Sequence, residues 1–171
     1  RVALPISATG GQVSITSGSS TQTSSGQILL HTANGAVTGT DGAAGGVSGA
    51  IVLSTGTSSS ADAQSGSVVL MTGEATGDAA GDIKLLVGSG SIGAGGDVVV
   101  TAGETTETGE IGGAVLVTSG GGDLSGAVTI KSGVAGDGAS GAMTFESGPS
   151  TTGSGALSMK SGTTTSGNSG A

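Results

Sequence analysis

The chain of 171 residues lacks several residue types on which active sites and compact cores usually depend. It contains no cysteine, tryptophan or tyrosine, two prolines and a single phenylalanine, Phe145. The absence of cysteine excludes disulfides and thiolate metal sites. The only histidine, His31, has no cysteine or carboxylate cluster beside it in its own segment, which favours an exposed surface residue over a catalytic or metal-binding one.

Positive charge and long apolar runs are also scarce. Four basic residues stand against twelve acidic ones, giving a formal charge of −8. A phosphate backbone requires a basic stripe, so the charge excludes a nucleic-acid partner and equally an anionic membrane surface. No apolar run approaches the roughly 18 to 20 residues that span a bilayer. The acidic, hydroxyl-rich composition favours an extracellular or cell-surface location.

What the chain has instead is glycine, 38 residues of it, in a regular arrangement. Pairs of apolar residues at i and i+2, the strand period, recur ten times along the chain, most often 15 residues apart. A glycine stands two residues before every pair (the leading glycine), and in nine of ten repeats another stands five residues after the first apolar position (the trailing glycine). We refer to the apolar pairs as the inner column and predict that they form the core: Val13, Ile15, Ile28, Leu30, Ile51, Leu53, Val68, Leu70, Ile83, Leu85, Val98, Val100, Val115, Val117, Val128, Ile130, Met143, Phe145, Leu157 and Met159.

Patterned glycine argues against a disordered low-complexity chain, and abundant glycine argues against helices. A period of about 15 residues suits one coil of a narrow solenoid. We therefore predict an all-β fold, a flattened parallel β-solenoid of about ten to eleven coils. A third position, four residues after the first apolar one, is small and mostly hydroxylated, and we expect it at a corner of each coil.

The prediction treats residues 1–171 as one array. Ser169, Gly170 and Ala171 repeat the start of a further strand, so we expect an excerpt of a longer repeat protein. The longest interval between repeats contains residues 34–48, which are either an inserted loop or a degenerate coil.

The positions between and directly after the two inner residues point outward and are apolar in the middle repeats. We refer to them as the outer column: Leu29, Val52, Val69, Met71, Leu86, Val99 and Leu116. They would form a patch of roughly 300 Å², near the upper end of what a monomer exposes without purpose. Either these are tolerated surface residues, or they contact a partner: a second copy or another structural chain or domain. The open sheet ends offer a second contact. The last three repeats are polar outside, with Lys131, Glu146 and Lys160 alternating in sign.

Other motifs predict no chemistry. Residues 88–93 match G-x-G-x-x-G, but another strand pattern follows where a helix would be needed. Asp82 and Asp97 share a repeat position, and three glutamates crowd 104–110, which indicates solvated charge since no calcium-binding nonapeptide repeats. We predict no catalytic, cofactor-binding or metal-binding residues and no cofactor, and O-linked glycans on the Ser and Thr turns remain open.

The motif SG-x-h-x-h-x-SG, where h is apolar, as in residues 125–133, resembles the Gly/Ser/Thr-rich parallel β-solenoid repeats of extracellular fibres and cell surfaces, including those of algae and other protists. The resemblance implies a structural or adhesive role and assigns no functional residues. The expected function is thus a structural segment of an extracellular filament, appendage or adhesin that associates through the outer column, and not an enzyme. Ice binding is the alternative; a carbohydrate-active enzyme is disfavoured because a carboxylate cluster and aromatic platforms are lacking.

Overall fold

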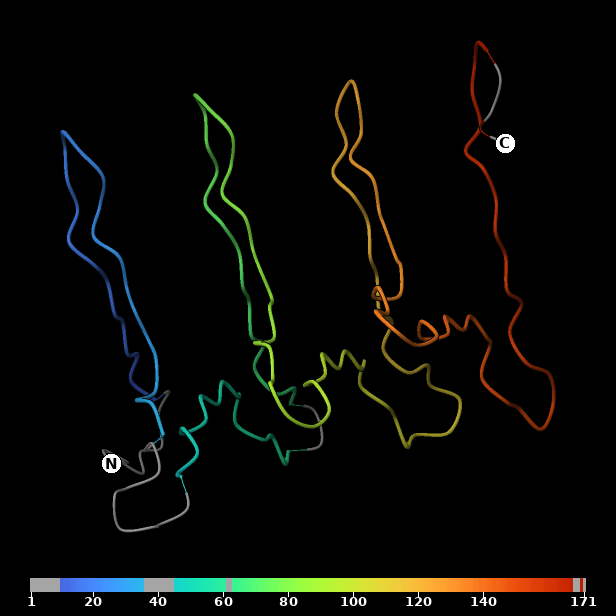
Figure 1. The fold of residues 1–171 in the computed structure, drawn as a ribbon, viewed down its shortest axis with the longest axis horizontal. Coiled ribbons are helices and arrows are strands. Elements are labelled where there is room, and N and C mark those ends of the chain that lie inside the picture. The colour runs from blue at the N-terminus through green and yellow to red at the C-terminus, as the bar shows by residue number, and fades with distance from the viewer. Residues whose placement is uncertain (1–9, 36–44, 61–62, 168–169, 171) are drawn as a thin grey trace. The chain divides into compact units, whose positions relative to one another are not determined.

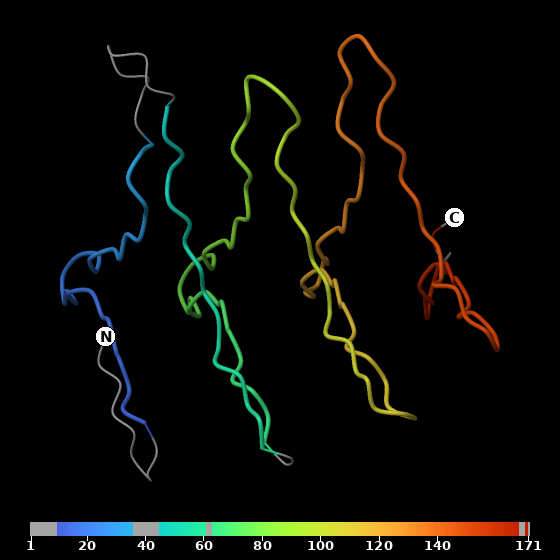
Figure 2. The ribbon, with the colours of Figure 1, turned by 90° about the horizontal axis from the view of Figure 1, so that it is seen from below.

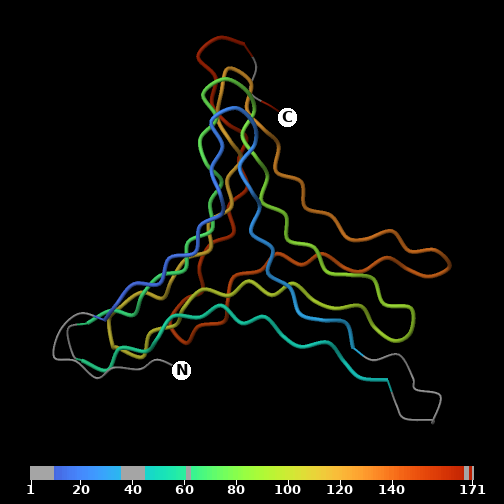
Figure 3. The same ribbon diagram turned by 90° about the vertical axis from the view of Figure 1, so that its left-hand side faces the viewer.

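A computed structural model describes residues 10–35, 45–60, 63–167 and 170. None of these residues belongs to a helix or a strand, and the ribbon is drawn without coils or arrows in three perpendicular views (Figures 1, 2 and 3). The predicted parallel β-solenoid is therefore wrong for the described part of the chain. Contacts divide the chain into two units, Arg1–Leu86 and Val87–Ala171.

The repeat is nevertheless visible in the backbone, as a regular series of bends. From residue 76 onward they recur at nearly even intervals, at 76–78, 91–93, 107–109, 122–124, 136–138, 151–152 and 165–167. The chain reverses direction at several of them, for example at the green tip near 76–78 and the orange tip near 122–124 (Figure 1), and at the yellow tip near 107–109 (Figure 2). The sequence period is therefore a period of turns, without a sheet.

Three of these bends end on a glycine with positive φ. The angles are 81° at Gly93, 89° at Gly109 and 111° at Gly167, each the third residue of its bend. Side chains with a Cβ rarely adopt this conformation. These three glycines are neither leading nor trailing glycines, and none of the regularly spaced glycines in the described part has a positive φ.

The chain has no buried core in its described part. No apolar side chain there is buried, and the whole chain exposes 16803 Å² of surface. A compact protein of 15.5 kDa would expose about 7,200 Å², less than half as much. The apolar pairs of the described part therefore do not pack on one another within the chain.

The β-solenoid prediction fails because strands need a ladder of backbone hydrogen bonds between repeats. In the described part, the backbone hydrogen bonds between main-chain groups have five donors: Gly26, Ala63, Glu110, Gly113 and Gly126. All five lie in or beside turns, and none lies in an apolar pair. Alternation of apolar and other residues fixes which side a side chain faces, but it does not bring two repeats together.

Hydrogen exchange of the monomeric chain will test this fold. We expect the amides of Val98, Val99 and Val100 to exchange within about tenfold of the rate of an unstructured peptide, because no main-chain acceptor in the described part bonds them. The Gly113 amide, bonded to the carbonyl oxygen of Gly103 at 2.8 Å, should exchange more slowly. NMR on a dilute sample measures both. Hundredfold protection of consecutive amides in the apolar pairs would contradict the open fold.

Candidate functional site

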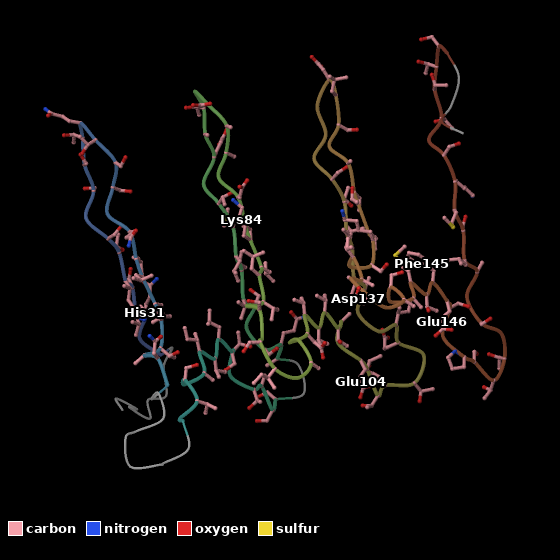
Figure 4. The ribbon with its side chains drawn as sticks, in the orientation of Figure 1. His31, Lys84, Glu104, Asp137, Phe145 and Glu146 are labelled. Carbon is pink, nitrogen blue, oxygen red and sulfur yellow. The ribbon has the colours of Figure 1, made fainter. Side chains whose placement is uncertain are left out.

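The structure leaves both predicted columns accessible to solvent. The inner column, predicted as core, is exposed from 48% at Ile51 to 86% at Val13, and the seven outer residues are exposed from 70% to 87%. Figure 4 shows Phe145, the largest member of the inner column, on this open chain. The two columns together form a repeated apolar surface that the described chain does not cover itself.

The two columns still differ in exposure, as residues on opposite sides of an extended segment should. Val98 is 59% exposed and its neighbour Val99 is 80% exposed, and Ile51 and Val52 differ in the same direction. The Nζ atom of Lys84, which Figure 4 labels, lies 2.7 Å from Asp82 Oδ2, so these residues, two apart, share one side of their segment. The alternation predicted from the sequence is present without the sheet.

The best sheltered side chains belong to the third column, which is small. Five of its members, and only two other described residues, are half-buried: Ser17, Thr32, Thr72, Ala102 and Ser119. Each lies against the leading glycine of the next repeat. A Cβ built on Gly49 would stand 3.5 Å from Thr32 Cγ2, and one on Gly126 would stand 3.7 Å from Ser119 Cβ.

We call each such contact a neck, because it joins the two ends of a turn segment. Seven necks are formed in the described chain, by these pairs: Ser17 with Gly26, Thr32 with Gly49, Thr55 with Gly66, Thr72 with Gly81, Val87 with Gly96, Ala102 with Gly113, and Ser119 with Gly126. Three also carry a backbone hydrogen bond from the leading glycine to the trailing glycine of the preceding repeat, at 2.8 to 3.0 Å. The necks are the recurring tertiary contact of the described chain.

In addition to the necks, hydroxyl groups stabilise several of the turns by accepting hydrogen bonds from backbone N–H groups. Ser20 Oγ accepts hydrogen bonds from the backbone N–H groups of Gln22, at 3.3 Å, and Thr23, at 2.9 Å. Ser150 does the same for Thr152 and Gly153 at 3.2 and 3.3 Å, and Thr164 accepts from the Ser166 N–H at 3.2 Å. Such local bonds are the known turn-forming role of Ser and Thr.

Sequence reasoning missed the neck pairing and these turn hydroxyls, although their signals were present. The third column and the leading glycines are both restricted to small residues, and each hydroxyl stands just before a bend. What the sequence did not reveal is that the corner residue of one repeat contacts the glycine of the next. The sequence predicted only that this residue lies at a corner of each coil.

The remaining candidates form no assembled site. No group of three or more His, Cys, Asp or Glu side chains is placed to hold a metal ion in the described part. His31 Nδ1 lies 3.3 Å from the Thr32 carbonyl oxygen. Gly35 lies against the backbone of Gly46 and Val47, so the two ends of the 34–48 segment are close together. Residues 36–44 of this segment lie outside the described residues. Ser169 and Ala171, which were predicted to begin a further strand, also lie outside them.

No protein-family model matches the chain, and no curated protein and no solved structure matches it. Among the described residues there is no helix long and apolar enough to cross a membrane.

The necks can be tested at Gly96. A Cβ there would stand 2.9 Å from Val87 Cγ1, and the stiff branched side chain of valine cannot easily move aside. We expect Gly96→Ala to abolish the nuclear Overhauser effect between the Val87 methyl groups and the α-proton of residue 96. Gly95→Ala is the matched control, because a Cβ on Gly95 meets nothing within 4 Å. Val87→Ala in the Gly96→Ala background removes the crowding and should restore a nuclear Overhauser effect between the methyl group of residue 87 and the α-proton of residue 96. If Gly96→Ala and Gly95→Ala give the same nuclear Overhauser effect between residues 87 and 96, the neck is refuted.

Proposed function

We propose that the chain is a structural repeat segment of an extracellular filament, appendage or adhesin. It associates laterally through its apolar columns, and its partner is a second copy or another structural chain of the same surface assembly. It is not an enzyme and requires no cofactor, nucleic acid or membrane. Glycans on the exposed Ser and Thr turns are compatible with this role.

The observation that carries the proposal is the repeated apolar surface itself. Monomeric proteins rarely leave contiguous apolar patches of more than a few hundred Å² uncovered. Here every large apolar side chain in the described part is exposed by 48% or more, in repeat after repeat. An enzyme places a few apolar residues around one pocket, whereas a surface that recurs with the period of the chain suits contacts along its length.

The necks support the same role. They hold the turn segments closed with small residues and glycine, and the apolar pairs lie outside them. The chain therefore uses its internal contacts at the turns and leaves its apolar side chains for association. From Ile51 onward the first residues of successive pairs stand 13 to 17 residues apart, a spacing that suits repeated contacts with another repeat chain.

Self-association can be measured by sedimentation velocity and negative-stain electron microscopy over a range of concentrations. We expect assemblies whose size grows with concentration. The double variant Val69→Thr and Val99→Thr keeps side-chain shape but adds hydroxyls that association would bury, and it should raise the concentration needed on the order of tenfold.

The matched control is Val47→Thr with Val134→Thr, two exposed valines outside the apolar pairs. It should assemble like the parent chain. A parent chain that stays monomeric at millimolar concentration, or equal effects of the two double variants, would contradict the proposal. Thermal hysteresis of the purified chain would favour ice binding instead.

A further inference from the structure

The last three repeats carry a charge pattern that the single chain does not use. Lys131, Glu146 and Lys160 occupy the same repeat position, three residues after the first apolar residue, and all three are exposed (Figure 4 labels Glu146). The described part contains one ion pair, Lys84 with Asp82, so these three charges have no ionic partner within that part. The alternating charges can therefore meet opposite charges only on a second chain.

The backbone beside these charges is equally free of partners. No backbone N–H in the pairs Val128 with Ile130, Met143 with Phe145, or Leu157 with Met159 donates to another main-chain group of the described chain. Segments of this kind, with unpaired N–H and C=O groups and apolar side chains, are templates for strand pairing with another molecule.

We propose that copies of this chain pair as parallel strands, offset by one repeat. This deepens the proposed self-association and rests on it. Parallel pairing places every repeat position opposite its equivalent, apolar against apolar and glycine against glycine. The interval from Val128 to Met143 and that from Met143 to Leu157 are nearly equal in length, so the match survives the offset.

Charge decides the offset. With no offset, Lys131, Glu146 and Lys160 each face the identical residue of the second copy, which gives three like-charge contacts. With an offset of one repeat, Lys131 faces Glu146 and Glu146 faces Lys160. Opposite charges directly across a strand pair are stabilising and like charges are destabilising. Antiparallel pairing that keeps the columns aligned instead places Lys131 opposite Ala127, so only the parallel offset uses the alternation.

An offset contact has a consequence for assembly. Each copy is left with one unpaired repeat, at opposite ends of the pair, and these repeats can accept further copies. Head-to-tail contacts that do not close generate open filaments. The charge pattern therefore favours growth over a closed dimer.

Charge variants test the electrostatic part. Glu146→Lys makes the three positions all positive and should raise the critical concentration of assembly about tenfold at low ionic strength, with the difference falling at about 1 M salt. The triple variant K131E, E146K and K160E inverts all signs, preserves the alternation and should assemble like the parent. Equal critical concentrations for parent and Glu146→Lys, or a triple variant as impaired as Glu146→Lys, would overturn the charge argument.

Crosslinking tests the register directly, because the parent chain has no cysteine. Thr129→Cys and an isotopically labelled Thr144→Cys are assembled together and oxidised, and the disulfides are identified by mass spectrometry. Adjacent parallel strands bring equivalent Cα atoms within disulfide range. Predominant 129 to 144 crosslinks support the offset. Assembly with 129 to 129 and 144 to 144 crosslinks overturns the offset alone, and no assembly overturns the proposed function with it.

Discussion

The arrangement of this chain depends on how little apolar side chain each repeat contains. Fixing one residue of backbone costs about 1–2 kcal/mol, and glycine loses the most freedom. Burying one large aliphatic side chain stabilises by about 1.5–3 kcal/mol. Each repeat has two inner side chains, and in the middle repeats one or two outer ones, to set against the backbone of a whole turn segment. Burial within a single chain therefore offsets little of the backbone entropy that ordering a repeat would cost. The chain is ordered by its own contacts only at the turns and necks.

Glycine has two different uses in such a chain. At Gly93, Gly109 and Gly167 it supplies a positive φ that other residues rarely adopt. At the leading position Gly96 the φ is not positive, and what counts is the absence of a Cβ, because that atom would stand 2.9 Å from Val87 Cγ1. Glycine thus supplies a positive φ in three bends and leaves room for a close approach in a neck.

The sequence predicted the periodicity and the two-sided pattern, because these are local properties, whereas the positive-φ turns fall on Gly93, Gly109 and Gly167, outside the regularly spaced glycines. Alternating exposure at Val98 and Val99, and the contact of Asp82 with Lys84, follow from the i, i+2 spacing. The prediction of a sheet was wrong. Whether two repeats pair depends on the balance of backbone entropy, apolar burial and hydrogen bonding, and the spacing of residues does not reveal that balance. The outer column was predicted as an exposed surface, whereas the inner column was predicted as core and is exposed as well. Contact of these residues with a partner stays a prediction, and the contact of each corner residue across the neck was missed.

Association changes the balance that leaves the single chain open. Between Val13 and Val128 a second copy contributes apolar side chains and backbone acceptors without a further turn to close, because the seven necks of that part are already formed. One matched pair there brings the next close to register, and each later contact costs less entropy. The leading glycines of the last two repeats, Gly141 and Gly155, form no neck, since a Cβ on either would meet nothing within 4 Å. When many copies associate, a weak preference for the offset register, such as the attraction between Lys131 and Glu146 of neighbouring copies, is repeated at every contact between copies. Charges too weak to order one chain can then select the register of many.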